Sequence, residues 1–382
     1  MSKKNRFSFS LRFLLIVTLI AALFFGSLGR RFQFIRHQRA AVKRLEEIRS
    51  RIEWNAHPGI VSRLFGGELF QDVTSVWIRR RPYLHEDDLE LIGRLRYLKK
   101  LKLEETPFDS AGLQHLSQLA NLETLEITNA KIVATGLTGL VGPKGLTTLT
   151  LSQTNIDDGG VSHITQQFLN LESLNLSNTQ ITDIATPALS RLKNLETLVL
   201  TNNRLTPDGI KKLKKCRTVS TLVLNNTVTD DQCLRVLSQL RELQELHLRF
   251  TKISDEGLTH LEKVKQLRNL SIGGTQISDA GLKTLANFPE LRKLDISGAH
   301  ITDTGLGHLL DVPLELLLAQ YTNATAAGVL RFLDLPDDVR NRITLQMGED
   351  ATVEELTRRP LFHTWSSRPR IVPYSGEKFC KY

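Results

Sequence analysis

Cysteine is scarce in this chain, and acidic residues are missing from its first part. Three cysteines in 382 residues cannot build the disulfide framework of a small secreted domain. No Asp or Glu precedes Glu46, although residues 1–54 contain twelve Lys and Arg; bases and acids are equal in number in the rest of the chain. The basic pI therefore belongs to the N-terminal part, and no nucleic-acid partner is expected.

The sequence also lacks a recognisable catalytic or cofactor-binding arrangement. The pairs Gly159-Gly160 and Gly273-Gly274 are not followed by the Lys-Ser or Lys-Thr of a phosphate-binding loop, and no Ser, His and Asp set can be assembled. A catalytic cysteine in an appended domain would need more chain than the last 49 residues provide. We therefore expect no enzymatic activity, no catalytic residue and no cofactor.

The chain does contain a repeat. Its clearest copy starts at Leu171 with the sequence LESLNLSNTQITD. Equivalent segments start every 23 to 25 residues, at Val73, Leu98, Leu122, Leu146, Leu171, Leu195, Val219, Leu243, Leu267, Leu291 and Leu314. Eleven such units over residues 73–333 indicate a solenoid, because one unit cannot bury its apolar face alone.

Each repeat predicts a strand, a turn and a short helix. Apolar residues at its fourth and sixth positions have strand spacing, so the third, fifth and seventh side chains face the other side of the sheet. A polar turn, usually with Thr, follows. The segment Ile253-Ser254-Asp255 and its equivalents then supply an N-cap hydroxyl and a carboxylate in the first helical turn. Leucines three apart, such as Leu258 and Leu261, have helix spacing.

This unit resembles the leucine-rich repeat in its ribonuclease-inhibitor-like form, which has about 24 residues. The resemblance covers roughly two-thirds of the chain. It implies an α/β solenoid shaped like a horseshoe, with a curved parallel β-sheet inside and helices outside, whose default role is to bind another protein. The family usually has Asn or Cys where this chain mostly has Thr, with Asn203 as the exception. A continuous asparagine ladder is therefore not expected, although Thr can still bond buried backbone.

An uncharged apolar segment at residues 13–29 follows a basic segment at residues 1–12. Its seventeen residues reach the lower limit for a transmembrane helix, and the resemblance is to bacterial leucine-rich-repeat proteins with an N-terminal membrane anchor. A cleaved signal peptide is the alternative, because small residues at 27–29 surround a possible cut, but two arginines follow at once. We expect an uncleaved, single-pass signal anchor. The side of the membrane that holds the solenoid is not determined.

The segments that flank the solenoid are expected to connect it to the membrane and to cover its ends. Residues 30–56 predict a basic juxtamembrane helix, either a spacer lying on anionic headgroups or a short dimerising coiled coil. Residues 57–72 predict an N-terminal cap. The segment 334–382 loses the repeat period and is expected to form a C-terminal cap over the apolar Leu316 and Leu318, followed by a frayed tail.

The histidines do not predict a metal site. His115, His163, His260 and His308 occupy one helical position in their repeats, and no two of them belong to adjacent repeats. Helices pack about 8–10 Å apart, whereas the ligands of one zinc ion lie about 2 Å from it. These side chains cannot share an ion, so no metal is expected.

The exposed inner face of the sheet is the remaining candidate for function. Its central strands carry small polar residues and valine, which are weakly informative. One patch differs, because it combines an aromatic residue and charges with the pair Gly273-Gly274, which is expected to leave a hollow. The predicted partner-binding residues are Asn225, Asn226, Glu245, His247, Arg249, Phe250, Lys293 and Asp295. In the alternative interpretation, Phe250 folds over the strand end and Arg249 pairs with Glu245 or a solvent ion.

Together these observations predict a membrane-anchored leucine-rich-repeat scaffold that binds another protein through its concave face and is not an enzyme. The alternative is a structural or adhesive cell-envelope protein in which the solenoid acts as a spacer. The two differ in a simple respect. A binder should capture a defined partner of low abundance, whereas an envelope component should itself be abundant and multivalent.

Overall fold

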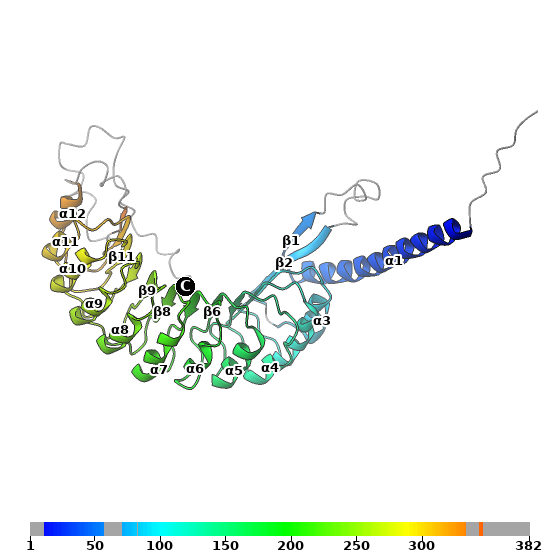
Figure 1. Ribbon diagram of the computed structural model, residues 1–382, viewed down its shortest axis with the longest axis horizontal. Coiled ribbons are helices and arrows are strands. Elements are labelled where there is room, and N and C mark those ends of the chain that lie inside the picture. Colours follow the sequence, from blue (N-terminus) through cyan, green and yellow to red (C-terminus); the bar gives the residue numbers. More distant parts are fainter. Residues whose placement is uncertain (1–10, 57–70, 82, 334–343, 347–382) are drawn as a thin grey trace, which may run out of the picture.

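The chain folds into a curved stack of repeats. The computed structural model describes residues 11–56, 71–81, 83–333 and 344–346. Figure 1 shows the strands along the inner side of a horseshoe and the helices along its outer side. Because the strands follow one another in chain order from β1 to β13, each repeat contacts mainly its neighbours, as a solenoid requires. The predicted α/β repeat architecture is confirmed.

Of the thirteen strands in the described residues, twelve form one parallel sheet, and β1 (Arg51–Ala56) pairs antiparallel with β2 (Gln71–Arg79). Equivalent repeat positions lie opposite each other across the sheet, so that Leu174 faces Leu198. The remaining strands are β3 (Lys100–Glu104), β4 (Thr124–Thr128), β5 (Thr148–Thr150), β6 (Ser173–Asn175), β7 (Thr197–Val199), β8 (Thr221–Val223), β9 (Glu245–His247), β10 (Asn269–Ser271), β11 (Lys293–Asp295), β12 (Leu316–Leu318) and β13 (Thr344–Gln346).

Short helices return the chain from one strand to the next. They are α3 (Glu86–Gly93), η2 (Ser110–Gln118), α4 (Ala134–Thr138), α5 (Asp158–Gln167), α6 (Thr186–Leu189), α7 (Pro207–Lys212), η3 (Leu213–Lys215), α8 (Asp231–Leu237), α9 (Asp255–Leu261), α10 (Asp279–Thr284), η4 (Leu285–Asn287), α11 (Asp303–Gly307) and α12 (Ala326–Leu333). Ser254, Ser278 and Thr302 are N-caps whose hydroxyls accept a hydrogen bond from the backbone. The N-caps predicted from the repeat are confirmed.

The core lies between the sheet and the helices, and the turn residues satisfy its backbone. The hydroxyl of Thr179 donates to the carbonyl of Leu176 at 2.9 Å, and that of Thr251 donates to the carbonyl of Leu248 at 2.6 Å. The Asn203 amide donates to the Leu176 carbonyl at 2.8 Å. Thr at the turn therefore bonds the buried backbone, as expected.

Aspartate carboxylates tie several repeats to the next one. Asp255 accepts hydrogen bonds from the backbone N–H of Ser278 at 2.8 Å and from its hydroxyl at 2.6 Å. Asp231 binds Ser254 in the same way, with distances of 2.8 and 2.7 Å. These recurring Asp residues hold the stack together, which explains their repetition without any catalytic role.

A residue with left-handed backbone follows each of the strands β2 to β12, at the eighth position of the repeat. Its φ lies between 51° and 72° at Arg80, Glu105, Asn129, Gln153, Asn178, Asn202, Asn226, Phe250, Gly274, Gly298 and Tyr321. Gly and Asn adopt this conformation at low cost, whereas a bulky side chain is strained in it. The members of this row that are neither Gly nor Asn are Arg80, Glu105, Gln153, Phe250 and Tyr321.

The N-terminal helix differs from the prediction. Helix α1 spans Leu11–Glu47, and the residues predicted to extend it to 56 form strand β1 instead. Ile52, within the segment predicted to be helical, lies opposite Val76 in the antiparallel pair. The physical reason is that β2 would otherwise leave its backbone groups unpaired at the edge of the sheet.

The second half of α1 packs on the first repeat. Ala41 and Leu45 are buried, and Arg44 donates from Nε to Asp88 Oδ1 at 2.6 Å, which raises the pKa of Arg44. Arg31 and the buried Asp72 form an ion pair at 2.9 Å. Helix α1 and β1 therefore cover the open end of the solenoid. The cap predicted at 57–72 lies outside the described residues except for its last two.

The predicted membrane span stays a prediction. Residues 13–29 are helical within α1, but most of their side chains lie outside the described residues. Among the residues that the structure describes, no helix combines the length and apolarity that crossing a bilayer requires.

The sheet continues beyond the predicted end of the solenoid at residue 333. Strand β13 pairs parallel with β12 and places the buried Leu345 opposite Leu317. Strand β13 lies in the segment that was predicted to form the C-terminal cap, and it covers the edge of β12. Leu316 and Leu318 are half-buried. The rest of the predicted C-terminal cap and tail, 334–343 and 347–382, lies outside the described residues.

Candidate functional site

The predicted partner-binding residues lie in or just after three strands, β8, β9 and β11, on the inner side of the horseshoe. In register, Glu245 of β9 lies beside Asn269 of β10, which lies beside Lys293 of β11. One row further along the strands, His247, Ser271 and Asp295 are neighbours. Asn225 and Asn226 follow β8. The strand order therefore brings the predicted residues together on one surface.

Arg249 has a partner that the sequence did not indicate. Its guanidinium reaches across the neighbouring strand, and Nη1 donates to Oδ2 of Asp295, two strands away. Gly273 leaves room for this crossing, since a Cβ there would lie 3.4 Å from Cζ of Arg249. Arg249 thus pairs with Asp295, whereas the alternative interpretation paired it with Glu245 or a solvent ion.

Asp295 is a buried acceptor that joins three repeats. Its side chain is 11% exposed and accepts from Arg249 Nη1, from the Ser271 hydroxyl at 2.9 Å and from the Ser297 backbone N–H at 3.0 Å. All three donors stabilise the ionised carboxylate. Asp295 is therefore part of the framework of this surface and not a group open to a partner.

Glu245 and His247 form a second pair on β9. The distance from His247 Nε2 to Glu245 Oε2 is 3.9 Å. Interaction with His247 lowers the pKa of the Glu245 carboxyl, and Asn269 and Lys293 contribute in the same direction while burial opposes them. Lys293 is exposed. The charges on this surface largely balance one another.

Phe250 occupies the space that we expected to be a hollow. Its ring lies over Gly274, where an added Cβ would be 2.5 Å from ring carbons Cδ1 and Cε1. The Arg249 guanidinium carbon lies 5.4 Å from the ring centroid, within the range of a cation–π interaction. The side chain nevertheless remains 61% exposed. Phe250 thus folds along the strand ends, but its ring still faces solvent.

The two asparagines have structural roles. Asn225 Oδ1 accepts from the backbone N–H of Arg249 at 2.8 Å. Asn226 donates to Asn202 at 2.8 Å, and Asn202 donates to Asn178 at 2.6 Å. A short asparagine ladder therefore exists, but on the exposed eighth position and not at the turn where the family has one. It leads along the edge of the sheet to Phe250.

Tyr321 is the residue that sequence reasoning missed. It belongs to the same left-handed row as Phe250 and is 74% exposed. The recurrence of Asn and Gly at the eighth position was the available signal. An aromatic residue at that position is anomalous once the left-handed conformation is recognised.

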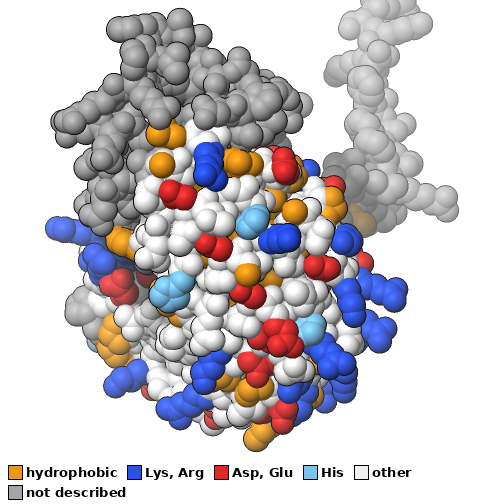
Figure 2. Space-filling view, turned by 90° about the vertical axis from the view of Figure 1, so that its left-hand side faces the viewer, with side chains coloured by type: hydrophobic (Ala, Val, Ile, Leu, Met, Phe, Trp, Pro, Cys, Tyr) orange, Lys and Arg blue, Asp and Glu red, His pale blue; other side chains and the backbone are white. Residues whose placement is uncertain are grey.

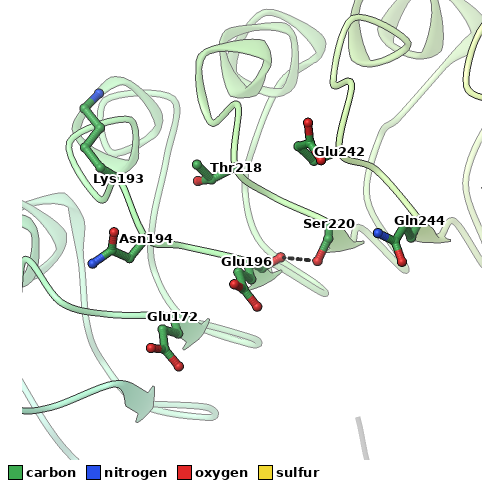
Figure 3. Close-up of a pocket in the computed structure, with 8 residues that line it drawn as sticks. All are labelled: Glu172, Lys193, Asn194, Glu196, Thr218, Ser220, Glu242 and Gln244. Carbon is green, nitrogen blue, oxygen red and sulfur yellow. Dashed lines mark hydrogen bonds between the residues drawn. The ribbon is translucent and has the colours of Figure 1, made fainter. Parts of the chain in front are cut away.

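A hollow on the opposite edge of the sheet has a different character. Figure 3 shows its side chains standing apart along the entries to successive strands, with the Ser220 hydroxyl donating to the Glu196 carbonyl at 3.4 Å. It is lined by Glu172, Lys193, Asn194, Glu196, Thr218, Ser220, Glu242 and Gln244. Its polar groups do not converge on one point, so it is a weaker candidate.

Figure 2 shows the side of the molecule that lies at the left of Figure 1, where acidic and apolar side chains are interspersed and basic side chains lie mainly toward the edges. Cys216 and Cys233 are buried, and burial raises their pKa to about 11 and about 12, so neither is an activated thiol. Within the described part of the chain, no group of three or more His, Cys, Asp or Glu residues is placed to hold a metal ion.

Comparison with known proteins identifies the repeats. The model described as "Leucine Rich repeats (2 copies)" matches residues 169–215, and "Leucine Rich repeat" matches residues 239–261 and 290–309. A search of curated proteins finds no match. These matches show that the chain contains leucine-rich repeats within residues 169–309.

Two solved structures similar to this chain are internalins from Listeria monocytogenes. One is an internalin with 20% sequence identity, covering 76% of this chain and 87% of its own, with a TM-score of 0.49. The other is internalin C2, with 23% identity, covering 62% of this chain and 83% of its own, with a TM-score of 0.40. The ribonuclease-inhibitor-like subtype stays a prediction.

Proposed function

We propose that the protein is a non-enzymatic scaffold that binds a protein partner through the concave face, at the surface formed by β8 to β11. The observation that carries the proposal is the exposed aromatic ring of Phe250 on a left-handed backbone. An aromatic ring that is 61% exposed in a left-handed conformation costs stability that Asn or Gly would not cost. Such strain is typical of functional positions. Exposed aromatic residues are also the commonest anchors of protein interfaces.

The contacts of Arg249 support the same site. Its bond to Asp295 and its stacking on Phe250 hold both side chains in place before a partner arrives. Side chains that are already ordered lose less entropy on binding. The function of Arg249 in this proposal is therefore to preorganise Phe250, with its remaining N–H groups available to the partner.

Replacing Phe250 or Arg249 with alanine should weaken partner capture by more than about 1 kcal/mol each. The partner would be trapped by chemical crosslinking in native membranes, identified by mass spectrometry and then titrated against each variant. Thr150→Ala and Asn175→Ala, on the central strands, should change capture little. Equal effects from all four substitutions, or none from the first two with the fold intact, would place the binding surface elsewhere.

A structural cell-envelope role is the competing proposal, and the same experiment separates the two. A spacer should be as abundant as other envelope components and should yield no defined, stoichiometric crosslinked partner.

We also propose that residues 13–29 anchor the protein in a membrane. The support is a segment of seventeen uncharged residues within a continuous helix, followed directly by two arginines. The full-length chain should stay in the membrane fraction after carbonate and high-salt washing. Ile20→Arg combined with Leu23→Arg should release it, because each buried charge costs about 2.5–3.5 kcal/mol. Recovery of a soluble chain that begins near Arg30 would contradict the anchor.

A further inference from the structure

Helix α1 runs along the first repeat in the same direction as strand β2. At the start of β2, Arg31 of α1 pairs with Asp72 at 2.9 Å. Beyond the end of β2, Arg81 donates from Nη2 to the carbonyl of Arg49, just after α1, at 3.4 Å. The part of α1 that precedes Arg31 therefore projects past the edge of the sheet at which the strands begin, which we call the entry edge (Figure 1).

This packing joins the proposed membrane span directly to the solenoid. No proline interrupts α1 between Leu11 and Glu47. Phe34, five residues after the span ends at residue 29, is 9% exposed. At 1.5 Å per residue, Phe34 lies about 8 Å beyond residue 29 along the helix. The apolar residues that a dimerising coiled coil would need, such as Ile35 and Leu45, are buried in the same way, so the helix is occupied by its own solenoid.

The entry edge of the first repeat lies at the depth of the lipid headgroups when residues 13–29 span the bilayer. The headgroup layer is about 5–8 Å thick on each side of the hydrocarbon core. Tyr97, on this edge just before β3, has its ring centroid 5.4 Å from that of Phe34 and 5.6 Å from Cζ of Arg31. The Tyr97 side chain is 42% exposed. Tyr and basic residues at this depth are typical of surfaces that lie against a membrane.

The charges near the entry edge leave an excess of cations. The carboxylates there are already paired with bases: Asp72 with Arg31, Glu90 with Arg94 at 2.6 Å, and Glu123 with Lys99 at 2.7 Å. Three further arginines are exposed, and within the described part of the chain none of them has an ion-pair partner: Arg36, Arg39 and Arg96. Their long stems allow the guanidinium groups to reach toward the membrane. Lipid phosphates are acceptors that match the guanidinium group.

We propose that the surface formed by Arg36, Arg39, Arg96 and Tyr97 binds the anionic phospholipid headgroups of the membrane in which residues 13–29 are anchored. The solenoid is thereby held in one orientation, with its first strands running away from the bilayer, and does not swing on a tether. This inference rests on the proposed membrane anchor. It adds the class of lipid that the protein binds and the orientation that binding imposes.

Energy transfer from the protein to labelled lipids tests the orientation. The full-length chain carries Cys380→Ser and a donor dye on one added cysteine, either Ala120→Cys before β4 or Lys131→Cys after it; the native Cys216 and Cys233 are buried. It is reconstituted in nanodiscs of phosphatidylcholine and phosphatidylglycerol, in which a trace of one lipid or the other carries the acceptor dye on its acyl chain. Position 131 lies about 26 Å further along the strand, so transfer should be larger from position 120.

Substitution of the arginines tests the binding of headgroups. Transfer from position 120 should be at least about twofold larger to labelled phosphatidylglycerol than to labelled phosphatidylcholine, since each cation near an anionic surface strengthens binding about fivefold. The combined substitution Arg36→Gln, Arg39→Gln and Arg96→Gln should remove this preference and leave the thermal midpoint unchanged. The matched control removes three exposed and unpaired cations from a distant repeat and should preserve the preference: Lys214→Gln, Lys215→Gln and Arg217→Gln.

The outcomes separate this inference from the proposed anchor. Equal transfer from positions 120 and 131 would mean that the solenoid swings freely. Equal transfer to the two labelled lipids, or loss of the preference in the matched control as well, would mean that this surface does not bind anionic headgroups. Each of these results overturns the inference and leaves the anchor in place. If the chain does not enter nanodiscs, or if carbonate releases it from membranes, the anchor fails and the inference fails with it.

Discussion

Replacing Leu248 with alanine should lower the free energy of unfolding by about 2–5 kcal/mol. Leu248 is fully buried between the sheet and the helices, and the neighbouring repeats hold its surroundings in place. A cavity at this site therefore cannot collapse fully. Leu176→Ala, at the equivalent buried position three repeats earlier, should have a similar effect. Both are measured by chemical denaturation followed by circular dichroism.

The shape of the transition is as informative as its midpoint. Because each repeat contacts mainly its neighbours, a lesion in the middle of the stack should broaden the transition or split it into steps. Ile184→Ala is the matched control, since this residue is 77% exposed, and it should change stability by less than about 0.5 kcal/mol. A sharp two-state transition with an unchanged midpoint in Leu248→Ala would contradict the solenoid.

The second large effect is expected at Asp295. Replacing it with alanine removes the acceptor for Arg249, for the Ser271 hydroxyl and for the Ser297 backbone N–H. Ser271 and Ser297 are buried, so the loss of their acceptor should lower the free energy of unfolding by about 2–4 kcal/mol. We expect a smaller loss of stability than the largest that breaking a buried ion pair causes. The Arg249 side chain is 34% exposed, so water can solvate its charge once Asp295 is removed.

Two further variants separate the hydrogen bonds from the charge. Asp295→Asn keeps an oxygen for Ser297 and should lose less stability than alanine. In a double-mutant cycle, Arg249→Ala combined with Asp295→Ala gives the coupling energy of the ion pair. Asp295→Ala with unchanged stability would mean that the contacts of this carboxylate do not hold the repeats together. Additive losses would mean that Arg249 and Asp295 do not interact in solution.

The predictions that succeeded depended on periodic patterns. A leucine pair two residues apart, an N-cap such as Ser254 and the spacing of Leu258 and Leu261 each report on local structure, and their recurrence made the interpretation secure. The N-terminal boundary failed for the opposite reason. Ile52 fits a helix stripe or a strand equally well over a few residues, and only the unpaired edge of β2 favours the strand.

The candidate site was predicted in outline and corrected in its contacts. The spacing of the repeats was enough to place the eight predicted residues on neighbouring strands. The partner of Arg249 was not predictable, because Asp295 is 46 residues away and becomes a neighbour only when the guanidinium crosses the strand between them. The expected hollow at Gly273-Gly274 was filled by the same two side chains, Arg249 and Phe250.

By itself, the sequence determined that this protein is a stack of strand–turn–helix units, because apolar periodicity and helix caps act within one repeat and are visible in every copy. The tertiary structure alone decided how the ends of the solenoid are covered and which side chains pair with one another across the inner surface. Those features depend on which side chains of different repeats meet, and on a left-handed residue after each strand that places Phe250 and Tyr321 on one edge. Such contacts arise only once the strands are in register, and no local pattern encodes them.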